Sequence, residues 1–162
     1  MPLPNIIAED VQEMDATLAE LLARSEASAA LIIDKGGFLI TQAGHAAQFD
    51  TTTLSALAAG SFAATQSMAQ LVNEPNFNSV YQQGENFSLL VLNVDSDCLL
   101  VAIFKAQVSV GVVKYYAAAS LDRVARLFQR ARQRNPEASV DLSVMNLEDT
   151  AEFFHRKQTG AA

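Results

Sequence analysis

The chain has 162 residues, of which 50% are hydrophobic and 18% charged, and its formal net charge is −7. This length suits a single domain with a buried core, and the composition excludes a wholly disordered chain. The negative charge gives no general attraction to nucleic acid or to anionic membranes, so we expect neither nucleic-acid binding nor membrane insertion.

The first half of the chain predicts a helix followed by a hairpin. The opening stretch MPLPNIIAED lacks the basic residues and long apolar core of a signal peptide, and no apolar run reaches the roughly 20 residues that span a bilayer, so we expect a cytoplasmic protein. Residues 8–27 place apolar side chains three and four residues apart, which indicates an amphipathic helix. The runs ALIID and FLIT flank Lys35-Gly36-Gly37, and a Gly-Gly between two apolar runs predicts a tight turn.

The second half predicts a long helix, three strands and another helix. Asp50 is a suitable N-cap for a helix that follows it, and Asn73-Glu74-Pro75-Asn76 ends that helix. The stretches FNSVYQQ, NFSLLVLNV and DCLLVAIF then predict a meander, and a helix follows from about Val108 to Arg134. The predicted fold class is therefore α/β (α+β): a five-stranded, mainly antiparallel sheet flanked by helices, in the order α-β-β-α-β-β-β-α. We expect this domain to cover residues 1–135 and a tail with a short amphipathic helix to cover residues 136–162.

No set of residues in the sequence predicts catalysis, a metal site or a cofactor. His45 and His155 are the only histidines and neither belongs to a metal-spaced motif, so His45 is expected to be an exposed loop residue. Cys98 is the only cysteine and lies in an apolar run, where it is expected to be a small buried hydrophobe. Asp95 and Asp97 lie in a predicted turn without a catalytic partner. The protein is therefore not expected to be an enzyme.

A cluster of arginines ends the last predicted helix. Cations near a helix C-terminus are favoured by the helix dipole, and this is a sufficient account of them. Binding of a partner's acidic patch or phosphate is the alternative. The cluster comprises Arg123, Arg126, Arg130, Arg132 and Arg134.

The long helix after Asp50 has one side that is made of small residues. At about 100° per residue, the side expected to cover the sheet comprises Leu54, Leu57, Ala58, Ser61, Thr65, Met68 and Val72. The opposite side gathers Ala56, Ala59, Gly60, Ala63 and Ser67. A mid-helix glycine costs roughly 0.5–1 kcal/mol relative to alanine, so close approach by another chain is one interpretation, and a plain alanine-rich surface is the other.

The strand that follows this helix is predicted to lie at an edge of the sheet. An open edge can pair with a second copy of the chain, and a two-fold dimer would then bring two small-sided helices side by side. We expect Ala56, Gly60, Phe77 and Val80 at this dimer interface.

The sequence resembles the Roadblock / dynein light-chain family, and most closely its bacterial MglB-type members. The resemblance rests on ALIIDKGGFLITQAG, FDTTTLSALAAGSFAAT, SLLVLNVDSDCLLVAIF and SVGVVKYYAAASLDRVARLF, and it covers roughly residues 8–134. It implies a homodimer whose paired central helices bind a small Ras-like GTPase of the MglA type and stimulate GTP hydrolysis, in cell polarity or motility. MglB-type proteins supply no arginine finger. On this interpretation Ala59, Ala63 and Ser67 are the expected GTPase contacts.

The sequence leaves several alternatives open for the role of the tail and for the effect of GTPase binding. MNLEDTAEFFHRK places Met145, Leu147, Phe153 and Phe154 on a short acidic helix, which could bind a partner, pack on its own domain or remain disordered. The alternative function is a non-catalytic scaffold or adaptor that binds a GTPase or assembles a complex without accelerating hydrolysis. A ligand-sensing domain is a further alternative, but it would need an internal polar pocket, whereas the predicted strands are rich in Leu and Val.

Overall fold

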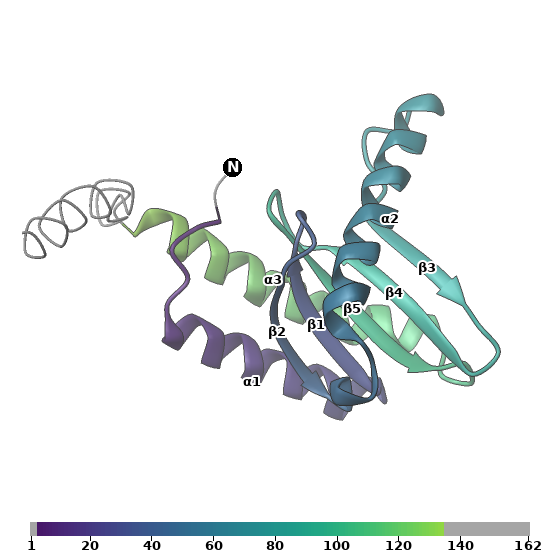
Figure 1. The fold of residues 1–162 in the computed structure, drawn as a ribbon, viewed down its shortest axis with the longest axis horizontal. Coiled ribbons are helices and arrows are strands. Elements are labelled where there is room, and N and C mark those ends of the chain that lie inside the picture. The colour runs from purple at the N-terminus through teal and green to yellow at the C-terminus, as the bar shows by residue number, and fades with distance from the viewer. Residues whose placement is uncertain (1–2, 135–162) are drawn as a thin grey trace, which may run out of the picture.

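The structure is a computed structural model that describes residues 3–134, and it confirms the predicted order of helices and strands (Figure 1). The predicted boundary at residue 135 and the tail residues Met145, Leu147, Phe153 and Phe154 lie outside the described residues. In chain order the elements are α1 (Ala8–Ser25), β1 (Ala29–Asp34), β2 (Leu39–Gly44), the short 3-10 helix η1 (Ala46–Gln48), α2 (Thr51–Leu71), β3 (Ser79–Gln83), β4 (Phe87–Asn93), β5 (Cys98–Lys105) and α3 (Val110–Gln133).

The five strands form one sheet in the order β2-β1-β5-β4-β3, and every neighbouring pair is antiparallel. Strands β1 and β5 lie inside the sheet and are almost wholly buried, which explains why their sequences are continuous apolar runs. Strands β2 and β3 form the two edges.

The two faces of the sheet are covered unequally. Helices α1 and α3 lie together on one face and α2 lies alone on the other (Figure 1). The core under α1 and α3 contains large side chains such as Met14, Phe104 and Phe128. The core under α2 is built by Phe62 and small residues of α2 against Leu31 and Val101 of the sheet. The outer side of α2 therefore has no helix or strand packed over it in the described part of the chain.

Two local features, an N-cap and a glycine turn, determine where α2 begins and how closely the β1–β2 turn packs against it. The Asp50 carboxylate accepts a hydrogen bond from the Thr53 backbone N–H at 3.1 Å, which confirms the predicted N-cap, and hydrogen bonds from Thr53 lower the pKa of Asp50. The predicted Gly-Gly turn is also confirmed, because Gly37 has a φ of +96°. A Cβ added at Gly37 would lie 2.8 Å from the Cα of Ala56, so glycine lets the β1–β2 turn pack directly against α2.

Ion pairs fix how α1 and α3 lie against each other. Arg134 Nη2 lies 2.8 Å from Asp10 Oδ1, and matching pairs join Arg130 to Glu13 at 2.5 Å and Arg123 to Glu20 at 2.6 Å. The latter two pairs are substantially exposed and stabilise the fold little, whereas the Asp10 carboxylate is nearly fully buried. Its Oδ2 also accepts a hydrogen bond from the Ile7 backbone N–H at 3.0 Å.

Replacing Asp10 by Asn is expected to destabilise the protein at neutral pH but not in acid. The hydrogen bond from Arg134 lowers the pKa of Asp10 below its ordinary value of 3.8, so the ionised carboxylate stabilises the folded state above that pH. This stabilisation is lost as the pH falls through the lowered pKa. Urea unfolding of wild type and Asp10→Asn should therefore give a difference in unfolding free energy at neutral pH that shrinks towards zero below pH 3.8. A difference that does not change with pH would show that the charge of Asp10 has no part in it.

Cys98 is fully buried at the start of β5, as predicted. Burial raises the pKa of its thiol, so the reactive thiolate is strongly disfavoured. Cys98 therefore acts as a core residue.

Candidate partner-binding surface

Helix α2 is exposed on one side and has no charged residue along its whole length. Surface helices ordinarily place charged side chains on their solvent side, as α1 and α3 do here. On α2 the solvent side instead exposes large apolar residues: Leu57, Met68 and Leu71 are 66%, 54% and 83% exposed. A contiguous apolar surface of this kind typically marks a site of protein–protein interaction.

Small residues lie beside these apolar side chains and complete what we call the outer face of α2. The outer face comprises Ala56, Leu57, Gly60, Ala63, Ala64, Ser67, Met68 and Leu71, all of them exposed. A Cβ added at Gly60 would meet no other atom within 4 Å, so packing within the chain does not require glycine there. The open space above Gly60 would let another backbone approach α2 closely.

The structure corrects the prediction for the sheet-facing side of α2. Leu57, Met68 and Val72 were expected to cover the sheet but are exposed, whereas Phe62 is buried against it. The remaining buried residues of α2 are all small: Thr51, Ser55, Ala58, Ala59 and Ala69. Because these residues are small, α2 lies close to the sheet, and Phe62 supplies the large apolar side chain that anchors it.

Ala59 is the one predicted GTPase contact that the structure places elsewhere. It is only 4% exposed and packs in the core between α2 and the sheet, so its side chain does not belong to the outer face. Ala63 and Ser67 lie on the outer face as predicted, and so do Ala56 and Gly60. The prediction for Ala59 was wrong because the sheet-facing side of the helix was centred on large residues such as Leu57 and Met68, whereas the structure centres it on Phe62.

The predicted edge strand is confirmed as β3, whose outer edge has no strand partner among residues 3–134. Within β3, the side chain of Val80 is half-buried and packs against the core under α2. Phe77 lies just before the strand begins. The Phe77 carbonyl accepts a hydrogen bond from Gln66 Nε2 at 2.7 Å, which ties α2 to the start of β3. This hydrogen bond connects the helix that carries the outer face to the segment that leads into the free edge strand.

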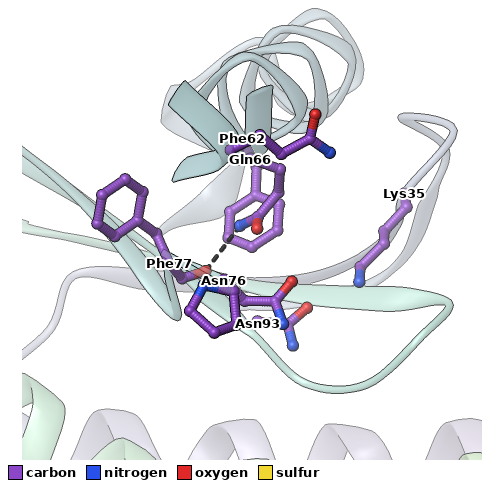
Figure 2. A pocket seen from close by; sticks show the side chains of 8 residues that line it. Lys35, Phe62, Gln66, Asn76, Phe77 and Asn93 are labelled. Carbon is purple, nitrogen blue, oxygen red and sulfur yellow. Dashed lines mark hydrogen bonds between the residues drawn. The ribbon is translucent and has the colours of Figure 1, made fainter. Parts of the chain in front are cut away.

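A pocket of about 130 Å³ opens between α2, the β1–β2 turn and the loop before β3 (Figure 2). Lys35 enters it from the turn, Gln66 and Gln70 from α2, and Asn93 from the end of β4. Sequence patterns gave no indication of it, because its residues come from four separate segments.

The arginine cluster of α3 is largely used within the chain. Arg123, Arg130 and Arg134 pair with carboxylates of α1. The Arg132 guanidinium lies 3.0 Å from Asp97 Oδ2 and also contacts Asp95, so the two aspartates of the β4–β5 turn serve to hold α3.

The described residues show neither a metal cluster nor a spanning helix. Among residues 3–134 no three His, Cys, Asp or Glu side chains gather where they could hold an ion, and none of the helices there is long and apolar enough to cross a bilayer. His45 is exposed next to η1, as predicted.

A five-stranded antiparallel sheet with one helix on one face and two on the other is the Roadblock arrangement, and the chain belongs to the Roadblock/LC7 domain family, whose sequence profile matches residues 13–104. Among solved structures it is similar to MglB of Myxococcus xanthus, with 30% identity over 78% of this chain and 95% of that one and a TM-score of 0.72. It is also similar to the gliding protein MglB of Thermus thermophilus, with 29% identity over 80% of this chain and 98% of that one and a TM-score of 0.72.

An MglB described as having a tetrameric arrangement matches equally well. It shares 29% identity over 81% of this chain and 98% of that one, with a TM-score of 0.74. A comparison with the curated proteins gave no match. The predicted family and fold class are thereby confirmed.

Proposed function

We propose that the chain forms a homodimer that binds a small Ras-like GTPase of the MglA type through the outer face of α2 and stimulates its GTP hydrolysis. The observation that carries the proposal is the outer face itself, which is uncharged, rich in small residues and, apart from the contact of Gly37 with Ala56, uncovered by other elements of the described chain. Such a face is poorly suited to contact with water and well suited to close contact with another protein.

The homodimer is proposed from the edge strand. Pairing of two β3 edges across a two-fold axis would satisfy the free backbone groups of β3 and would place two copies of α2 near each other. We propose Ala56, Gly60, Phe77 and Val80 for this contact and Ala63 and Ser67 for the GTPase. The similarity to MglB supports this assignment of a GTPase as partner.

The proposed stimulation requires no catalytic group from this chain. The outer face of α2 carries no arginine that could enter the nucleotide site of a GTPase. The protein would instead bind the hydrolysis-competent conformation of the GTPase more tightly than the other conformations, and the acceleration is limited by that difference in affinity. The compartment we propose is the cytoplasm, and the process is cell polarity or surface motility, by analogy with the Thermus protein named as a gliding protein.

GTP turnover by the Ras-like GTPase encoded nearest to this chain is the test. With the protein in excess, we expect turnover to rise about tenfold or more, equal to at least about 1.4 kcal/mol of barrier reduction. Binding without acceleration would favour the scaffold or adaptor function. Absence of binding would contradict the proposal.

A further inference from the structure

The pocket beside α2 is lined by a lysine, Lys35, that forms no ion pair within the described chain. Lys35 is the charged residue among the side chains that line the pocket, and the others are amides, a proline and two phenylalanines. No carboxylate lies within ion-pair distance of its ammonium among residues 3–134, although the chain as a whole is acidic. The pocket therefore presents one positive side chain next to an uncharged helix, and the carboxylates of Asp34 and Asp97 lie outside its lining.

The ammonium of Lys35 lies near the Phe62 ring, which also lines the pocket. Its Nζ lies 5.7 Å from the centroid of the Phe62 ring, and its backbone N–H donates to the Asp97 carbonyl at 2.9 Å. Figure 2 shows the side chain directed from the turn towards the amides of Asn76 and Asn93.

Asn93 adds a second unsatisfied group. Its Oδ1 is buried and has no hydrogen-bond partner, although a buried polar atom of this kind is normally paired. Asn93 also lines the pocket, and its carboxamide carries an NH₂ donor as well as this oxygen. Asn76 and Gln70 place further amides around the same space.

The size of the pocket limits what it can hold. Sites for small-molecule ligands typically measure roughly 300–1,000 Å³, whereas this pocket measures about 130 Å³. It can accommodate one side chain of a protein partner. The charge and the amides favour a carboxylate, because a charge-assisted hydrogen bond from Lys35 is stronger than a neutral one.

The pocket adjoins the outer face of α2. Gln66 and Gln70 line the pocket, while Ala63 and Ser67, which lie three residues before each of them, are on the outer face. Residues three apart are neighbours on a helix surface, so the pocket and the outer face meet along α2 and one partner surface could contact both.

We propose that this pocket receives an Asp or Glu side chain of the GTPase, with its carboxylate paired to Lys35 and hydrogen-bonded by the surrounding amides. This inference rests on the proposed function. It makes Lys35 a positioning contact that fixes the orientation of the partner on an otherwise featureless apolar face, since apolar contacts are not directional and an ion pair is.

The test compares Lys35→Met with Lys114→Met in binding to the neighbouring Ras-like GTPase loaded with a non-hydrolysable GTP analogue. Both variants lose one lysine charge, but Lys114 is exposed on α3, on the opposite face of the sheet. Methionine keeps most of the apolar stem over Phe62. We expect Lys35→Met to weaken binding about five- to tenfold at low salt, with a smaller salt dependence than wild type, and we expect Lys114→Met and Lys35→Arg to bind nearly as wild type.

Each other outcome overturns a specific claim. Equal affinity of Lys35→Met and wild type would overturn the pocket proposal while leaving the proposed function intact. A loss of dimer in sedimentation of Lys35→Met would assign the pocket to the contact between copies and would likewise overturn it. Failure of wild type itself to bind the GTPase would overturn the proposed function and the pocket proposal together.

Discussion

Ala63→Arg should abolish GTPase binding while the fold and the dimer persist. Ala63 is exposed on the outer face of α2, where a long charged side chain would hold a partner away from the helix and would lose its hydration on contact. Arginine has nearly the helix propensity of alanine, so the helix itself is not weakened. We expect affinity to fall by at least about 100-fold, or about 2.7 kcal/mol, in titration calorimetry.

Two matched variants make this result interpretable. Ala118→Arg places the same side chain on an exposed alanine of α3 and should leave binding, sedimentation and thermal unfolding unchanged. Ala59→Arg is only four residues before Ala63, but Ala59 is buried against the sheet, so this variant should unfold or aggregate. Wild-type affinity in a folded Ala63→Arg protein would mean that the outer face is not the binding surface.

The elements of this fold could be predicted because their signals are local. The apolar spacing of α1, the continuous apolar runs of β1 and β5, and the Gly-Gly turn each depend on residues within one short segment. The Asp50 cap is likewise set by a contact between residues three apart. Such local sequence signals agree with the overall fold, so the elements that they predict are present in the folded structure.

The orientation of α2 could not be predicted in the same way. Hydrophobic periodicity identifies the buried side of a helix by contrast with a charged side, and α2 has no charged residue to provide that contrast. Large apolar side chains at Leu57 and Met68 then indicate the wrong side, because size alone does not distinguish a core from an interface. The pocket at Lys35 could not be predicted from the sequence either, because it forms only where the β1–β2 turn, α2 and the end of β4 come together in the folded chain.

Phe62→Ala is expected to be among the most destabilising single changes in α2. Phe62 is 4% exposed and is the large side chain among the buried residues of this helix, so its removal leaves a cavity that the small neighbours cannot fill. Phenylalanine-to-alanine changes in cores cost about 3–5 kcal/mol. Because the chain contains no tryptophan, the loss is best followed by circular dichroism during urea unfolding, at one fixed protein concentration so that dimerisation does not alter the comparison.

Leu71→Ala supplies the control, because it also removes a large apolar side chain from α2, but one that is mostly exposed. Its unfolding free energy should stay within about 0.5 kcal/mol of wild type. A large difference between the two variants would mean that Phe62 attaches α2 to the sheet and that Leu71 contributes little to the stability of the fold. Equal and small effects would mean that Phe62 does not anchor the helix. In that case the small buried residues of α2, such as Ala58 and Ala59, would have to hold the helix on the sheet.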